Sequence, residues 1–409
     1  MLLKKSILLP NKTIQICGSK SISNRLLILH SLFENIRIEN ISDAQDTSLL
    51  KKALESEDEL INVHHAGTAM RFLTAYFAQK EGRNVILTGS QRMLQRPIKE
   101  LTEALLFLGA DIQYLGEEGY PPLKISGKKL IRDEVIISSG ISSQFITALM
   151  LIAPKLENGL TIHLEGKIAS RPYIEMTLDI LTSLGISCEF NRKIIKISPL
   201  DLHQKLSNVF YFEIESDWSS ASYYYAIAAL GRKIINLRNF QPHSCQADSR
   251  VKEIYWDYFG INTISDAQEH RISICPEPFA YPDMIQIDMN DCPDIVQTVC
   301  VTSAALQIPF EITGLETLKI KETDRLQALH KELQKIGCET EITENSIASV
   351  RFFEPEEPIF IKTYNDHRMA MSFAPYCLKK EITIEDENVV EKSYPKFWED
   401  LKEILDPIN

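Results

Sequence analysis

One pattern recurs four times along this 409-residue chain and limits the folds it can adopt. A basic residue is followed by a stretch with helical periodicity, a glycine and a short alternating strand. The glycines, at intervals of 76, 75 and 77 residues, are Gly109, Gly185, Gly260 and Gly337. Glycine commonly ends a helix because it adopts the left-handed conformation without steric cost. A helix that ends at such regular intervals indicates internal repeats.

A second series of helices runs in step with the first. These stretches are apolar on most faces, which predicts buried helices. They begin near Ser23, Gly67, Ser142, Ser219, Asp294 and Asp366. With a degenerate amphipathic helix after Asp46 and a last one after Lys392, the chain reads as six copies of an α/β unit. The interval from Ser23 to Gly67 is only 44 residues, so we expect the first unit to have a reduced sheet.

Six such units exceed one hydrophobic core, and three in each of two domains is the natural division. The junction is expected between Gly185 and the helix near Ser219, where residues 208–218 read as a strand that runs into a helix cap. A first strand at residues 6–15 precedes the first buried helix and could pair with either half.

The composition excludes several kinds of partner. The net charge of −12 argues against a nucleic-acid-binding surface or an anionic membrane, because both need clustered Lys and Arg. A small anionic substrate needs only a local positive pocket. The eight cysteines form no CxxC pair and no zinc-ligand cluster, which is typical of reduced thiols in a cytoplasmic protein. We expect no signal peptide and no membrane span.

The starts of the buried helices in the first half carry basic and hydroxyl side chains. A helix N-terminus presents unpaired N–H groups and a partial positive charge, so several together would bind anions. "GSKSISNR" is not a Walker loop, and a lysine before a helix is more often solvated. The candidate residues of this half are Lys20, Ser21, Arg25, Gly67, Arg96, Ser142, Ser143, Gln144, Ser170 and Tyr173.

The second half adds carboxylates to the same kind of position. Asp294 opens a buried helix in "CPDIVQT", where a plain N-cap is the alternative interpretation. "KIKETDRL" brings Lys321, Glu322 and Arg325 into one turn, which by default would be a solvated face. "NDHRMAM" supplies Arg368 together with His367, for which a structural role held by its neighbours is the simpler interpretation. Lys392 follows in "EKSYPKFW".

These motifs, in the order "GSKSISNR", "HAGTAMRFL", "RPI", "SSQF", "KETDRL" and "NDHRMAM", resemble the enolpyruvyl transferase family. The resemblance extends from Lys20 to Lys392 and is strongest to the branch that acts on a phosphorylated shikimate. It implies two similar domains, each of three sheet-and-helix units around buried parallel helices, an inside-out α/β barrel. It also implies a first domain at residues 14–214, a second at 1–13 plus 215–409, and an active site in the interdomain cleft.

The resemblance further implies a role for each candidate residue. Shikimate 3-phosphate would contact Ser21, Arg25, Ser142, Ser143, Gln144, Ser170, Tyr173, Asp294, Thr317 and Lys321. Phosphoenolpyruvate would contact Lys20, Gly67, Arg96, Gln144, Arg325, Arg368 and Lys392. Arginine suits planar carboxylate and phosphate groups through its bidentate fork. No cofactor, metal, nucleic acid or membrane partner is implied, and the protein is expected to be a monomer.

The implied reaction is an addition followed by an elimination that releases phosphate. The substrate hydroxyl loses a proton as it attacks phosphoenolpyruvate, while the methylene carbon gains one. Asp294 is the candidate base for the hydroxyl. Glu322 and Lys20 are candidates for the methylene proton, and the sequence does not choose between them.

The chain departs from the family pattern at three positions. His65 and Phe72 stand where members usually read "NAGTAMRP", and Thr317 replaces a frequent asparagine.

One alternative function is that of the sister enzyme that acts on UDP-N-acetylglucosamine, which usually has a reactive cysteine before the "RPI" helix; "LTGSQRMLQRPI" has none. The other is a catalytically inactive anion-binding homologue, although Lys20, Asp294 and Glu322 are all present.

Overall fold

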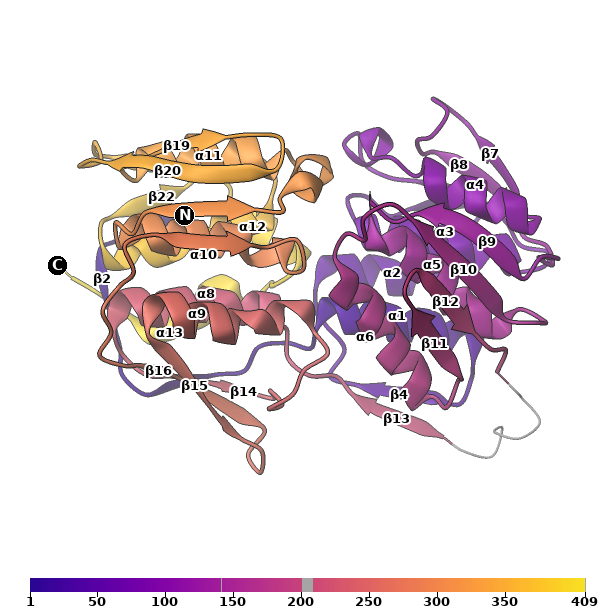
Figure 1. Ribbon diagram of the computed structural model, residues 1–409, viewed down its shortest axis with the longest axis horizontal. Coiled ribbons are helices and arrows are strands. Elements are labelled where there is room, and N and C mark those ends of the chain that lie inside the picture. The colour runs from indigo at the N-terminus through magenta and orange to yellow at the C-terminus, as the bar shows by residue number, and fades with distance from the viewer. Residues whose placement is uncertain (141, 201–208, 409) are drawn as a thin grey trace. The chain divides into compact units, whose positions relative to one another are not determined.

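The computed structural model describes residues 1–140, 142–200 and 209–408 (Figure 1). The chain forms two compact units. One combines Met1–Gly18 with Glu215–Asn409, and the other is the continuous segment Ser19–Ile214. Each unit has its own buried helices and surrounding sheets, so each is described separately.

In the unit Ser19–Ile214, three buried helices pack against one another. They are α1 (Lys20–Leu32), α3 (Gly67–Gln79) and α5 (Ser143–Ile152). Their apolar residues cover most faces, so burial on all sides is the way to remove them from water. Three amphipathic helices lie outside them, α2 (Gln45–Glu55), α4 (Lys99–Leu108) and α6 (Arg171–Ser183).

Two four-stranded sheets and one two-stranded sheet complete this unit, counted over its described residues. The first has the order β5 (Leu60–Asn62), β6 (Asn84–Thr88), β8 (Leu123–Ser126), β7 (Asp111–Tyr114). The second has the order β11 (Cys188–Asn191), β12 (Ile194–Ile197), β10 (Leu160–Glu165), β9 (Glu134–Ser138).

The two-stranded sheet pairs β4 (Ile36–Glu39) in parallel with β13 (Phe210–Glu213). This confirms the reduced sheet that the short interval after Ser23 predicts. The predicted strand at residues 208–218 is likewise present as β13, although Asn208 lies outside the described residues. Asp217 then caps the next helix by accepting from the Ser220 N–H at 2.8 Å.

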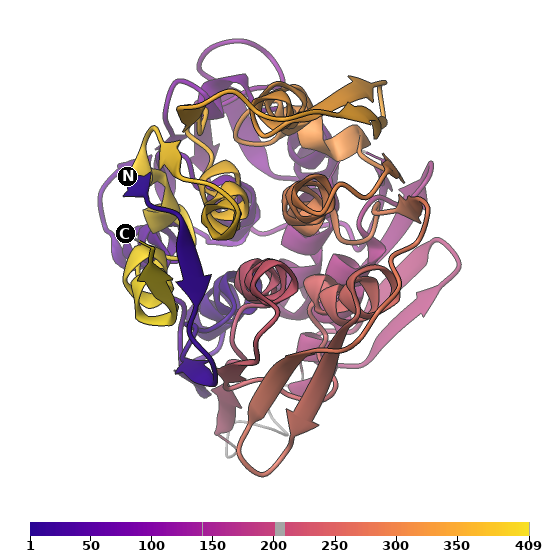
Figure 2. The same cartoon turned by 90° about the vertical axis from the view of Figure 1, so that its left-hand side faces the viewer.

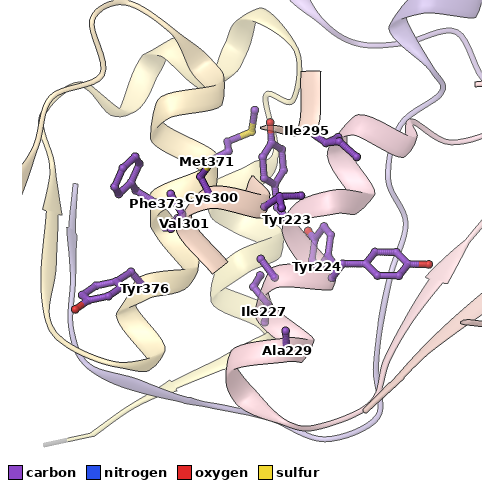
Figure 3. Packing of buried hydrophobic residues seen from close by; sticks show 14 of the residues in the cluster. Tyr223, Tyr224, Ile227, Ala229, Ile295, Cys300, Val301, Met371, Phe373 and Tyr376 are labelled. Carbon is purple, nitrogen blue, oxygen red and sulfur yellow. The ribbon is translucent and has the colours of Figure 1, made fainter. Parts of the chain in front are cut away.

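The other unit repeats the arrangement. Its buried helices α8 (Trp218–Gly231), α10 (Val296–Ala305) and α12 (His367–Phe373) contact one another and are seen end-on in Figure 2, with strands outside them. Figure 3 shows Tyr223 of α8, Val301 of α10 and Phe373 of α12 in the same apolar core. The amphipathic helices are α9 (Val251–Phe259), α11 (Arg325–Lys335) and α13 (Phe397–Ile404).

Four sheets belong to this unit in its described part. One four-stranded sheet has the order β15 (Ile261–Asp266), β16 (Arg271–Pro276), β14 (Ile235–Arg238), β3 (Lys12–Ile14). The other has the order β17 (Ile285–Asp288), β18 (Phe310–Thr313), β20 (Ser346–Phe352), β19 (Cys338–Ile342). The smaller ones are β1 (Leu2–Leu3), β22 (Ile382–Ile384), β21 (Ile359–Ile361), and β2 (Ser6–Leu8), β23 (Leu405–Pro407).

The N-terminal segment pairs only with strands of residues 215–409 in the described structure. The single strand predicted at residues 6–15 is two strands, because the chain turns at Asn11, whose φ is 55°. β2 pairs antiparallel with β23, and β3 pairs parallel with β14. The Ser216 hydroxyl also donates to the Ile16 carbonyl at 2.7 Å.

The repeat glycines all adopt the left-handed conformation, as predicted. Their φ angles are 108° at Gly109, 73° at Gly185, 63° at Gly260 and 86° at Gly337. Each lies at or one residue beyond the C-cap of an amphipathic helix. The repeat read from the sequence is therefore a repeat of the structure.

Candidate active site

In the unit Ser19–Ile214, side-chain contacts join the first turns of four helices. Lys20 begins α1, and its Nζ lies 3.2 Å from Oδ2 of Asp46 in the first turn of α2. Gln144, at the start of α5, donates from Nε2 to Oγ1 of Thr68, at the start of α3, over 3.3 Å. Because N–H groups and the helix dipole favour anions at such positions, this end of the unit suits phosphate and carboxylate groups.

Arg25 connects α1 to α6 and is buried. Its Nε donates to Thr177 Oγ1 at 2.8 Å, and its Nη2 donates to the Tyr173 carbonyl at 3.1 Å. Nη1 donates to the Ser21 carbonyl at 2.7 Å. These bonds hold Ser21 and Tyr173, two predicted site residues from distant parts of the sequence, beside the same guanidinium.

Arg96 lies directly against Gly67. A Cβ atom added to Gly67 would be 2.5 Å from Arg96 Nη1 and 2.9 Å from its Cζ, so only glycine leaves room for the guanidinium there. Arg96 is buried, at 7% exposure. A second guanidinium, that of Arg71, donates to the Pro97 carbonyl at 2.7 Å and to the Gly67 carbonyl at 3.3 Å. Arg71 therefore fixes the backbone on both sides of the Gly67 and Arg96 contact.

The remaining hydroxyl residues also lie at helix starts. Ser142 caps α5 by accepting from the Gln144 N–H at 3.2 Å, and Ser143 is buried in its first turn. Ser170 precedes α6 in the left-handed conformation, with φ of 54°. A non-glycine residue in that conformation is uncommon and is a feature often found at functional sites.

In the other unit, Arg325 binds three carboxylates. Nη1 lies 3.0 Å from Asp294 Oδ1, Nη2 lies 2.6 Å from Glu322 Oε2, and Nε lies 2.7 Å from Asp366 Oδ2. Burial disfavours the charge of Arg325, but Asp366, Glu322 and Asp294 outweigh it and raise the pKa of the guanidinium. The start of α11 thus carries a permanent positive charge at the centre of a carboxylate cluster.

Asp294 and Glu322 each have a further cationic partner. Asp294 Oδ2 lies 2.8 Å from Arg368 Nη2, and Asp294 Oδ1 lies 3.7 Å from Lys321 Nζ. Glu322 Oε1 lies 2.7 Å from Lys392 Nζ. Both carboxylates are oriented by these cations yet keep some exposure, 20% for Asp294 and 13% for Glu322. Oriented, reachable carboxylates can accept and return protons.

Asp248 belongs to the same region and was missed by the sequence analysis. It is buried, and its Oδ2 accepts from the Ser219 hydroxyl, which in turn accepts from Arg368 Nη2 at 3.4 Å. Burial, and then the neighbouring charge of Asp294, raise the pKa of Asp248 to about 7, against the opposing charge of Arg368. An acid in the short turn before an amphipathic helix gives no sequence signal of burial.

The structure brings together most of the predicted residues within each unit. Thr317 is the exception: it lies in the short helix Glu316–Ile320, and within the described residues no hydrogen bond joins it to the cluster around Asp294. His367 is buried, with Nδ1 3.7 Å from Asp366 Oδ1, and its structural role stays a prediction. Asp46 and Asp366 are carboxylate partners that the predicted site did not include.

Two further findings concern the described residues only. The described residues contain no group of three or more His, Cys, Asp or Glu side chains placed to hold a metal ion. Within the same ranges, every helix is too short or too polar to cross a bilayer.

Comparison with known proteins identifies a family. The family model for EPSP synthase (3-phosphoshikimate 1-carboxyvinyltransferase) matches residues 48–401. A 3-phosphoshikimate 1-carboxyvinyltransferase from Bacteroides fragilis is 44% identical over 400 residues, which cover 95% of this chain and 94% of that one. One from Methanospirillum hungatei is 36% identical, with 94% of each chain covered.

Solved structures agree in fold. EPSP synthase from Acinetobacter baumannii superposes with a TM-score of 0.72 at 20% identity, covering 98% of this chain and 97% of the other. The enolpyruvyl transferase NikO from Streptomyces tendae gives a TM-score of 0.69 at 12% identity, with 98% and 97% covered. The α/β architecture of repeated units, predicted from the glycine intervals and the resemblance, is confirmed.

Proposed function

The chain belongs to the EPSP synthase (3-phosphoshikimate 1-carboxyvinyltransferase) family, and from this we propose how its residues perform that reaction. The activity is transfer of the enolpyruvyl group of phosphoenolpyruvate to the 5-hydroxyl of shikimate 3-phosphate, with release of phosphate. It is a step of the shikimate pathway toward chorismate and aromatic amino acids. Asp294, Glu322 and Lys20 are the catalytic residues of the proposal.

Shikimate 3-phosphate is held mainly at the helix starts around Arg25. The Arg25 contacts that join Ser21 to Tyr173 support this assignment, as does the placement of Ser142, Ser143 and Ser170 at the starts of α5 and α6. Neutral hydroxyl donors and one guanidinium suit a phosphate and a hydroxylated ring. Lys321 adds a mobile charge, while Thr317 is a weaker candidate, because it lies outside the hydrogen-bonded cluster in the described residues.

Phosphoenolpyruvate is assigned to two groups of cationic side chains, one in each unit. Lys20 and Arg96 are the cations of the first group, Gly67 leaves room for the Arg96 guanidinium at the start of α3, and Gln144 contacts Thr68 in the same turn. Arg325, Arg368 and Lys392 are the second group, around the carboxylate cluster. Phosphate leaves as an anion, so these cations stabilise the charge that develops in the transition state.

Asp294 is the base for the substrate hydroxyl. The observation that carries this assignment is that Asp294 and Glu322 share Arg325 while each binds a second cation of its own. Two carboxylates held in one cluster by separate cations can serve two proton transfers, one at the hydroxyl and one at the methylene. Glu322, with Lys20, is assigned to the methylene proton.

The test is phosphate release from the purified protein with phosphoenolpyruvate and each acceptor. We expect turnover with shikimate 3-phosphate. Turnover only with UDP-N-acetylglucosamine would favour the sister activity, and binding without turnover would favour an inactive homologue. Asp294→Asn should keep the fold and substrate binding and lose kcat by on the order of 10²–10⁴-fold. Asp291→Asn, three residues away, is the matched control.

The scattered cysteines favour a reducing compartment, so we place the enzyme in the cytoplasm. A monomer is proposed as its state in solution. Size-exclusion chromatography with light scattering tests the monomer directly.

A further inference from the structure

Asp46 lies between two basic side chains beside the Gly67 and Arg96 contact. Its Oδ2 accepts from Lys20 Nζ at 3.2 Å, and its Oδ1 is 3.9 Å from His65 Nε2. The Asp46 side chain is 3% exposed, whereas Lys20 is 16% and His65 is 38% exposed. A nearly buried carboxylate therefore faces one permanent cation and one side chain that can change its charge.

The backbone fixes this carboxylate in place. Asp46 is in the first turn of α2, where a negative charge is favoured by the helix dipole. α2 packs against both α1 and α3, so Asp46 is held between the helix that begins at Lys20 and the one that His65 precedes. His65 comes one residue before the cap of α3, two residues from Gly67.

We propose that Asp46 positions the Lys20 ammonium group, and that the protonation of His65 sets how strongly Asp46 holds it. The inference rests on the proposed function, in which Lys20 contacts phosphoenolpyruvate. When His65 is neutral, Lys20 is the one charged member of the two basic side chains that the Asp46 carboxylate attracts. When His65 is protonated, its imidazolium competes with Lys20 for the Asp46 carboxylate. It also adds a positive charge near the start of α3. Lys20 is then less tightly bound to the protein and the anion meets more positive charge.

The sign of the pH dependence follows from the charges around His65. Asp46 on α2 faces His65, Lys20 on α1 contacts the same carboxylate, and Arg96 lies against Gly67, two residues along the chain from His65. Histidine gains its charge between about pH 8 and about pH 5. Lower pH in that window should therefore tighten phosphoenolpyruvate binding, through a group that is not itself a ligand.

The test compares KM for phosphoenolpyruvate between the native enzyme and His65→Asn, from about pH 5.5 to about pH 8.5. Ionisation of the substrate affects both proteins equally, so the ratio of the two KM values isolates His65. We expect the variant's KM to exceed the native value by roughly two- to fivefold at the acidic end, with the ratio approaching one at the alkaline end.

His64→Asn is the matched control. It is the same substitution one residue away, at an exposed position whose φ of 46° asparagine tolerates. A KM ratio that is flat with pH for His65→Asn, or one that is equally pH-dependent for His64→Asn, would overturn the proposal.

A second measurement does not depend on activity. The ring signals of His65 are followed by NMR against pH in the native protein and in Asp46→Asn. Loss of the facing carboxylate should move the midpoint of the His65 titration to lower pH, and an unchanged midpoint would refute the coupling. If the midpoint moves but the native enzyme shows no turnover, the proposed function fails while the Asp46 and His65 coupling stands.

Discussion

Arg325 and Asp366 form an ion pair in which both side chains are buried, with Arg325 Nε 2.7 Å from Asp366 Oδ2. Asp366 also caps α12, accepting from the Arg368 N–H at 2.9 Å. One carboxylate thus fixes two arginines, one through its guanidinium and the other through its backbone. Arg325 and Arg368 are consequently part of the framework of their unit. Loss of either side chain should affect stability as well as turnover.

Replacing Arg325 with methionine would leave Asp366, Asp294 and Glu322 without their shared cation. Breaking a buried pair by removing one partner typically costs about 3–5 kcal/mol, so urea unfolding should show a loss of that order. Arg351→Met is the control, since Arg351 pairs with Glu339 on the surface and is 72% exposed. That change should cost no more than about 1 kcal/mol. Equal losses for the two variants would contradict the framework role.

Glu322→Gln keeps the shape of the side chain and removes its charge. If Glu322 moves the methylene proton, kcat should fall by on the order of 10²-fold or more. The dissociation constant for shikimate 3-phosphate should change little. The measurement is phosphate release together with exchange of solvent deuterium into the methylene group. Glu316→Gln, an exposed position outside the cluster, controls for the loss of one charge. Exchange at the native rate in Glu322→Gln would remove it from the proton transfer.

Gly67→Ala should weaken phosphoenolpyruvate binding without unfolding the protein. The added Cβ would contact the Arg96 guanidinium, which is the end of a flexible side chain and can move away. We therefore expect a higher KM for phosphoenolpyruvate, with circular dichroism unchanged. In Gly116→Ala, the new Cβ would be 3.6 Å from Pro122 Cδ, an ordinary contact, so the KM should stay native. A native KM in Gly67→Ala would show that Arg96 is not a substrate ligand.

Asp248 should give stability a defined pH dependence. Its pKa of about 7 in the folded state lies above the ordinary value of 3.8, so the folded protein binds the proton more tightly than the unfolded chain. The stability from this group is complete below the unfolded pKa and is lost as pH rises toward about 7. Asp248→Asn should remove that loss. The unfolding free energy of the variant minus that of the native protein should therefore increase as pH rises toward about 7. The exposed Asp257→Asn should show no such trend in the same denaturant titrations.

Sequence reasoning succeeded where local chemistry determines the structure. A left-handed glycine ends a helix whatever surrounds it, so Gly109 and Gly260 marked the repeat before any contact was known. Caps such as Ser142 and Asp366 are likewise local, because each bonds to a backbone N–H two residues ahead.

Sequence reasoning was incomplete where long-range packing determines which side chains are buried. Asp46 and Asp248 each stand in the first turn of a helix or short helical turn, where acids are common on exposed surfaces. Their burial depends on segments distant in the sequence, Lys20 in the first case and Ser219 in the second. Thr317 was included through the resemblance alone, and the described structure supplies no hydrogen bond to the cluster that would support it.

The pairing of the N-terminal strands has a consequence for biosynthesis. Leu2 pairs with Thr383, and Ser6 pairs with Pro407, so these N-terminal strands can pair only after strands far along the chain have been made. Within the part of the chain that the structure describes, every strand of Ser19–Ile214 pairs inside that segment, so the segment can fold while translation continues. Residues 1–18 must wait, and a chain that stops short of β22 and β23 would keep an unpaired, aggregation-prone N-terminal edge.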